Sequence, residues 1–195
     1  MLPHRPSGDS DPQRNRRTKT QPMDLAWLEE RALRYAARWE ASAAGVATLL
    51  ERKIHERCER TGESPDVALE MIPALVTKLL ERGYVDDHRF ATGVLERQRR
   101  RGDSTARIRA RLIAKGISES LVDELLAEED PETEIHAAWK LARRRRLGPY
   151  CGDPTERRES RDRHLGVLCR QGFDLETALR IVDADGPPES NWESS

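Results

Sequence analysis

The chain has little of what membrane proteins and disulfide-rich proteins are built from. Only 5% of its 195 residues are aromatic, and no apolar run approaches the roughly 20 residues that cross a bilayer. Cys58, Cys151 and Cys169 are widely spaced and form no CxxC pair, so neither a disulfide framework nor a zinc site is expected. The N-terminus has no apolar segment of the secretory type. We therefore expect a soluble, cytoplasmic protein that does not enter a membrane.

Sequence motifs of catalysis are also missing. We find no Gly-rich phosphate loop, no nucleophile elbow and no paired-carboxylate motif. The five histidines are scattered without ligand spacing, and the start of a helix accounts for the acidic pair Asp86-Asp87. The chain is therefore expected not to be an enzyme and to need neither a metal nor a cofactor.

What the chain does have is charge and helix-forming residues. Charged residues make up 35% of the sequence and hydrophobic ones only 36%, which favours a thin, extended helical fold with much solvated surface. Residues 1–22 and 186–195 hold few apolar residues and are expected to be disordered, although Trp192 is an unusual residue to leave in a flexible tail.

Between these ends, glycines divide the chain into similar segments. Gly62, Gly116 and Gly172 each close an amphipathic segment, and they are 54 and 56 residues apart. This period predicts an all-α fold of three tandem three-helix repeats, stacked in an elongated, curved array of either hand. The predicted units are residues 23–83, 84–130 and 131–185.

Apolar spacing gives more detail for the first unit. It predicts a helix over residues 25–39 whose apolar stripe includes Tyr35 and Trp39. Ser42 is expected to cap the second helix, and Pro73 predicts a kink or a late start in the third. Each unit is too small to bury its own apolar face, so we expect burial by stacking of the units.

Charge is strongly segregated along the chain. Residues 97–115 hold eight Lys or Arg against one acid, residues 116–136 hold eight acids and no Lys or Arg, and residues 138–170 hold ten Lys or Arg against four acids. The segregation indicates a surface for an anionic or acidic partner, and solvation of helix faces is the alternative. The candidate contact residues are Arg97, Arg99, Arg100, Arg101, Arg107, Arg109, Arg111 and Lys115.

The middle of the chain resembles a known family. GYVDDHRFA, the basic segment RRRGDSTARIRARLIAKGI and the short helix LVDELL are similar to the second repeat of the RecX family of recombination regulators. The resemblance covers roughly residues 25–184. It implies a structural role for the matching motif positions, with glycines as turns and with Phe90, Ile108 and Leu112 as core. Those positions are Gly83, Tyr84, Asp86, Asp87, Arg89, Phe90, Ile108, Leu112 and Gly116.

The resemblance also implies a function. Members of this family are non-enzymatic modulators of the RecA recombinase in DNA repair, recombination and the SOS response. They lodge in the groove of the RecA filament on single-stranded DNA and restrain its ATP hydrolysis and strand exchange. The expected partner is thus the RecA filament, with weak binding to single- or double-stranded DNA, and the expected state is a monomer. Two alternatives stay open: a general nucleic-acid-binding helical module that acts without RecA, and a helical scaffold for another protein.

Overall fold

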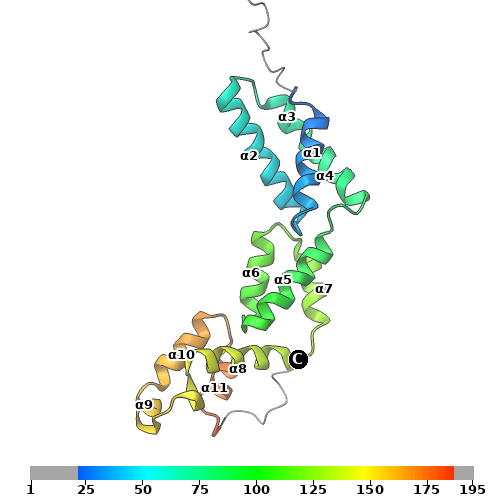
Figure 1. Cartoon of the computed structure of the whole chain (residues 1–195). Coiled ribbons are helices and arrows are strands. Elements are labelled where there is room, and N and C mark those ends of the chain that lie inside the picture. Colours follow the sequence, from blue (N-terminus) through cyan, green and yellow to red (C-terminus); the bar gives the residue numbers. More distant parts are fainter. Residues whose placement is uncertain (1–21, 187–195) are drawn as a thin grey trace, which may run out of the picture.

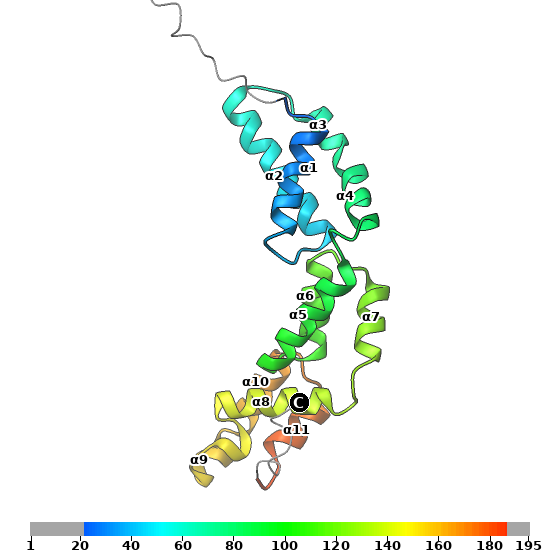
Figure 2. The same ribbon diagram turned by 45° about the vertical axis from the view of Figure 1, so that its right-hand side comes forward.

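The computed structural model of the chain describes residues 22–186, so the predictions for the two ends and for Trp192 lie outside the described residues. Every regular element in that range is a helix, and the helices gather in three groups that follow one another along an elongated array (Figures 1 and 2). We call these groups units 1, 2 and 3. No helix in residues 22–186 is both long and apolar enough to span a membrane.

Unit 1 contains four helices because its third predicted helix is broken. The hydroxyl of Ser42 accepts the Gly45 N–H at 3.1 Å and caps the second helix, as the sequence indicates. The third segment breaks at Met71, and Pro73 lies in the first turn of the helix that follows, which is the predicted late start. The first helix ends before Trp39, so this side chain is 56% exposed and its predicted burial was wrong. The helices are α1 (Leu25–Ala36), α2 (Ala43–Thr61), α3 (Asp66–Glu70) and α4 (Ile72–Glu81).

Unit 2 has three helices that all begin at capping side chains. Asp86, Ser104 and Ser118 each accept a backbone N–H from three residues further on, at 2.9, 3.3 and 3.4 Å. Gly102 ends the first helix in the left-handed conformation, which costs a glycine little. The helices are α5 (Asp87–Arg101), α6 (Thr105–Ala114) and α7 (Glu119–Ala127).

Unit 3 departs from the three-helix plan. Between its first helix and α10 it contains a short 3₁₀ turn and an additional helix, α9, which starts because Asp153 accepts two backbone N–H groups and Pro154 occupies the first helical position. The elements are α8 (Thr133–Arg145), η1 (Gly148–Tyr150), α9 (Pro154–Glu159), α10 (Arg161–Arg170) and α11 (Leu175–Val182).

Each unit buries its own hydrophobic cluster. Leu28 and Leu50 are fully buried in unit 1, Ile108 and Leu112 in unit 2, and Ile181 in unit 3, and the three clusters stay separate. The expected burial by stacking was therefore wrong. Burying one such side chain contributes about 1.5–3 kcal/mol.

Two hydrogen bonds link units 1 and 2. The hydroxyl of Ser42 donates to the carbonyl oxygen of Lys115 at 2.8 Å, and the Ala43 N–H donates to the carboxylate of Asp87 at 2.7 Å. A backbone N–H that is free at the start of α2 thus bonds a carboxylate at the start of α5, and the cap serine donates a hydrogen bond to the residue that follows α6. These bonds tie the first two units together.

The joint between units 2 and 3 repeats this arrangement. The hydroxyl of Ser104 donates to the carbonyl oxygen of Gln171 at 2.6 Å, and the Thr105 N–H donates to the carboxylate of Glu134 at 2.8 Å. Ser104 and Glu134 play the parts in this joint that Ser42 and Asp87 play in the first joint. The array is therefore built with one joint geometry used twice.

The glycine period follows from these joints. A Cβ at Gly116 would lie 2.2 Å from the Cβ of Ala44, and one at Gly172 would lie 2.5 Å from the hydroxyl of Ser104. At Gly62, which follows α2, the added Cβ would have no atom within 4 Å, because no other unit packs there. All three glycines have positive φ, but close packing between units is an additional requirement only at Gly116 and Gly172.

Removing a joint serine is expected to destabilise the protein more than removing an ordinary cap. Ser104→Ala leaves the Gln171 carbonyl and the Arg107 N–H without their partner at a fully buried site, which should cost about 1–3 kcal/mol. Ser118→Ala is the matched control, because Ser118 is an exposed cap and makes no bond between units; about 1 kcal/mol or less is expected. Urea unfolding of both variants measures the difference, and equal losses would contradict a role for Ser104 in the joint.

The buried His164 should make stability depend on pH. Its side chain is 2% exposed, and its Nδ1 accepts the Gly148 N–H at 3.2 Å. Burial lowers the pKa of His164, and the neighbouring cations of Arg163 and Arg157 act in the same direction. The unfolded chain therefore binds the proton first, and stability falls as the pH drops from about 7 through the ordinary pKa of about 6.5.

The free energy of unfolding should fall by at most about 1.4 kcal/mol per pH unit through the protonation of His164. Thermal unfolding between pH 8 and pH 5 measures it, and His164→Gln, which keeps a neutral acceptor, should flatten the profile. The exposed His88 supplies the control variant, His88→Gln, which should keep the wild-type slope. An unchanged profile in His164→Gln would contradict the assignment.

Candidate functional site

Three of the predicted contact residues gather in a cleft between units 1 and 2. Arg97 comes from α5, Arg111 comes from α6, and Lys115 is the C-cap residue that directly follows α6. The cleft has a volume of about 390 Å³, which lies within the range of small-ligand sites. We call it the junction cleft, and its lining residues are Tyr35, Trp39, Glu40, Phe90, Val94, Arg97, Gln98, Arg111 and Lys115.

The junction cleft carries uncompensated positive charge. Arg97, Arg111 and Lys115 are exposed, and none of their side chains forms an ion pair within residues 22–186. Glu40 is the one acid among the lining residues, and its carboxylate accepts from the Arg89 guanidinium at 2.7 Å. That ion pair leaves the three cations of the cleft available to an anionic partner.

A second basic cleft adjoins the first. It lies within unit 1 between α1 and α2, has a volume of about 450 Å³, and shares Tyr35 and Trp39 with the junction cleft. We call it the unit 1 cleft, and its lining residues are Trp27, Arg31, Arg34, Tyr35, Arg38, Trp39, Leu49, Lys53, Glu56, Arg57 and Arg60.

Sequence reasoning missed the cations of the unit 1 cleft. The signal was present, since Arg31, Arg34 and Arg38 recur at spacings of three and four residues, the first two on α1 and the third just beyond its end. Lys53, Arg57 and Arg60 do the same on α2. Glu29, Glu30 and Glu40 flank the first segment, and Glu56 and Glu59 lie within the second, so charge counting alone did not single them out.

Two of these arginines are structural. The guanidinium of Arg31 lies 3.7 Å from the centre of the Trp27 ring, and that of Arg57 lies 5.2 Å from it. Arg57 is 4% exposed and donates to Glu63 at 2.9 Å, and burial lowers the pKa of Arg31. Arg34 and Lys53 form ion pairs with Glu30 and Glu56, at 2.5 and 2.6 Å. Within residues 22–186, the cations of the unit 1 cleft that form no ion pair are therefore Arg38 and Arg60, and Arg38 lies 5.6 Å from the Trp39 ring.

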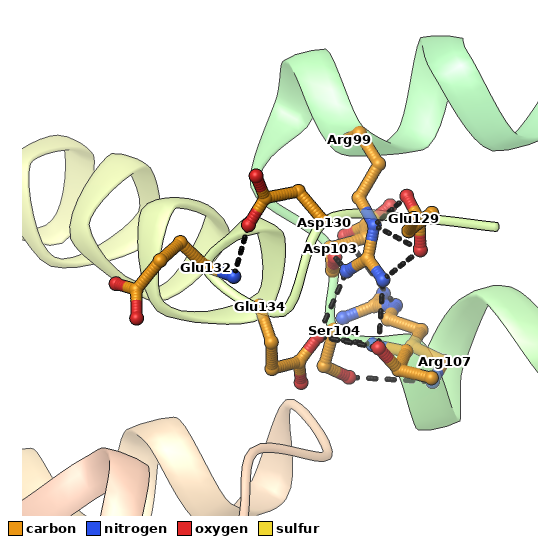
Figure 3. A network of polar contacts seen from close by, with 9 residues as sticks. Arg99, Asp103, Ser104, Arg107, Glu129, Asp130, Glu132 and Glu134 are labelled. Carbon is orange, nitrogen blue, oxygen red and sulfur yellow. Dashed lines mark hydrogen bonds and ion pairs between the residues drawn. The ribbon is translucent and has the colours of Figure 1, made fainter. Parts of the chain in front are cut away.

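Arg99 lies inside the molecule, contrary to the surface role that we expected. Its guanidinium donates to Glu129 at 2.6 Å, to Glu134 at 2.8 Å and to the Thr105 hydroxyl at 2.7 Å, and its side chain is 11% exposed (Figure 3). Burial opposes the charge of Arg99, but hydrogen bonds to both carboxylates outweigh burial and raise its pKa. Arg99 thus joins α5 to the start of α8, and we do not propose it as a partner contact.

The remaining predicted contact residues lie away from the junction cleft. The Arg107 guanidinium donates to the side chain of Gln171 in unit 3, and it lies 3.8 Å from Asp103. Arg109 forms a surface ion pair with Asp123 at 2.5 Å. The candidate contact residues therefore lie in separate groups and do not form one surface. The residues outside the junction cleft are Arg99, Arg100, Arg101, Arg107 and Arg109.

The motif positions are mainly structural in this chain. Gly83 has φ of 69°, Phe90, Ile108 and Leu112 are buried, Asp86 caps α5, and Asp87 forms the first joint. Tyr84 differs, because its side chain is 50% exposed and only its backbone takes part in the turn. Within residues 22–186, no group of three or more His, Cys, Asp or Glu side chains is arranged to hold a metal ion.

Comparisons with known proteins find similarity to one family. Residues 86–126 match the family described as the second three-helix domain of RecX. The regulatory protein RecX of Myxococcus xanthus is 32% identical over 160 residues, which are 82% of this chain and 86% of that protein. The Thermus thermophilus regulatory protein RecX is 31% identical and covers 80% of this chain and 94% of its own. A crystal structure of a regulatory protein RecX superposes with a TM-score of 0.62 at 26% identity, covering 82% of this chain and 71% of that chain.

Proposed function

The chain belongs to the RecX family of regulatory proteins, and on that premise we propose that it binds the RecA filament on single-stranded DNA and slows ATP hydrolysis and strand exchange. The observation that carries the proposal is the convergence of Arg97, Arg111 and Lys115 in one cleft without acidic partners. The protein would act in the cytoplasm as a regulator in DNA repair and recombination. It would act by binding alone, as a monomer, without catalysis or a cofactor.

The elongated array suits a helical groove. A filament presents the same protein surface and DNA phosphates again at each protomer, so separate units can make separate weak contacts whose effects multiply. The two polar joints support this, because they keep the three units in a fixed relation. A rod that bridges protomers would resist the relative movement that accompanies ATP turnover.

A second candidate function is nucleic-acid binding without RecA. The observation that favours it is the pair of adjoining basic clefts, which share the aromatic residues Tyr35 and Trp39. Cations combined with aromatic side chains are typical of surfaces that bind single strands.

A salt titration separates the two functions. Fluorescently labelled protein is titrated with single-stranded DNA, either bare or coated with RecA and a slowly hydrolysed ATP analogue, from 50 to 300 mM salt. The proposal predicts affinity for the filament at least about tenfold above that for bare DNA at physiological salt, with bare-DNA binding falling steeply as salt rises. Equal affinity for both would support the second candidate and contradict the first.

A further inference from the structure

The junction cleft contains a buried polar group that the protein itself does not satisfy. Gln98 is 6% exposed and lines the cleft, and its Oε1 has no hydrogen-bond partner in the described part of the chain. Buried side-chain amides are nearly always paired, because an unpaired one loses its bonds to water. Oε1 itself has almost no accessible surface, so a ligand in the cleft would bond this side chain through its amide NH₂ group.

Next to this amide lies an exposed aromatic surface. Trp39 is 56% exposed, and it lines both the junction cleft and the unit 1 cleft. Phe90 and Val94, both nearly buried, provide an apolar lining beside it. A flat apolar group with a polar edge would contact the Trp39 ring and could bond Gln98.

Cations surround this surface in both clefts. Arg97, Arg111 and Lys115 line the junction cleft, and Arg38 lies beside the Trp39 ring in the unit 1 cleft. Because Trp39 belongs to both clefts, a ligand stacked on it would have positive charge available in two directions. That pattern fits a planar group set between two anionic ones.

We propose that the junction cleft binds an unpaired nucleotide of single-stranded nucleic acid. The base stacks on Trp39 and hydrogen-bonds Gln98 through its edge, while Arg97, Arg111 and Lys115 bind the phosphates. A duplex does not fit this site, because pairing hides both the base face and the edge. An acidic peptide would satisfy the cations but brings no planar group with a polar edge for Trp39 and Gln98.

This site rests on the proposed function in that a filament would bring its single strand to the cleft. The test therefore leaves RecA out, so that each proposal can fail separately. Anisotropy of a labelled 20-nucleotide thymine strand is measured with wild-type protein and single variants at several salt concentrations. Circular dichroism of each variant confirms that it remains folded.

Trp39→Ala should weaken binding roughly 5- to 150-fold, the effect of losing one stacked base. It should leave the slope of log affinity against log salt unchanged, because no phosphate contact is lost. Trp39→Phe keeps a ring and should retain most of the affinity. Lys115→Gln should instead reduce that slope by about 0.7, the value for one phosphate contact on a single strand.

Gln98→Leu provides the sharpest distinction from a structural role. It should weaken binding several-fold while raising the melting temperature by about 2–4 °C, since it removes a buried, unpaired amide. If Gln98 served only to pack the structure, its replacement would not raise the melting temperature.

Three results would overturn the proposal. The first is equal affinity of wild type and Trp39→Ala for the strand. The second is duplex DNA or thymidine monophosphate bound as tightly as the strand, which would assign the cleft to another nucleic-acid form or to a free nucleotide. The third is a poly-glutamate peptide whose binding depends on Trp39, which would make the cleft a protein-docking site.

Discussion

Inhibition of RecA should be lost when Arg97, Arg111 and Lys115 are all replaced by glutamate. The three cations lack ion-pair partners in the described chain, so the substitution changes the local charge of these side chains from three positive to three negative. Like charges brought together at an interface cost several kcal/mol, so affinity for the filament should fall by on the order of 100-fold or more. The readout is single-stranded-DNA-dependent ATP hydrolysis by RecA across a titration of the variant.

The control must change the net charge equally without touching the cleft. Arg145, Arg163 and Arg170 are exposed residues of unit 3 outside both clefts, and their triple replacement by glutamate should retain most of the inhibition. Equal loss in both triple variants would mean that net charge, and not the junction cleft, determines binding. Both proteins should unfold as the wild type does, because none of the six side chains is buried.

The largest effect on folding is expected from Arg99→Ala. The guanidinium is held by Glu129 and Glu134 at 2.6 and 2.8 Å, and its removal leaves two carboxylates close together without their cation. Breaking a fully buried ion pair on one side costs about 3–5 kcal/mol, and because Arg99, Glu129 and Glu134 are 11%, 16% and 27% exposed, the loss here should be smaller, on the order of 2–3 kcal/mol. Because a domain of this kind has a total stability of about 5–15 kcal/mol, the variant should unfold at a much lower urea concentration.

Arg109→Ala is the matched control for this prediction. Arg109 also forms an ion pair, with Asp123, but its side chain is 43% exposed and Asp123 is 62% exposed. Surface pairs of this kind contribute about 0–1 kcal/mol, so the midpoint should hardly move. Similar midpoints for Arg99→Ala and the wild type would contradict the internal role of Arg99.

The fold was largely predictable because its signals are local. Capping by Ser42 and the late helix start near Pro73 follow from neighbouring residues in the chain, and the structure confirms both. The exposure of Trp39 was not predictable, since it depends on α1 ending at Ala36 rather than continuing in phase. The separate clusters of the units were missed because a one-dimensional pattern does not show how much area a small bundle encloses.

The candidate site was harder to predict, since it forms between units. Charge counting selected residues 97–115 but did not distinguish Arg99, which is held by acids 30 and 35 residues away, from Arg97, which faces the cleft. Nor did it indicate that Trp39 and Gln98 line one cleft between units 1 and 2. Periodicity places a side chain relative to its own helix, and only the joint geometry places it relative to the next unit.

The most direct test is the rate of ATP hydrolysis by RecA on single-stranded DNA as the protein is added. If the array bridges protomers in the filament groove, the rate should fall well below its starting value at less than one protein molecule per RecA protomer. An unchanged rate at equimolar protein would contradict regulation through filament binding.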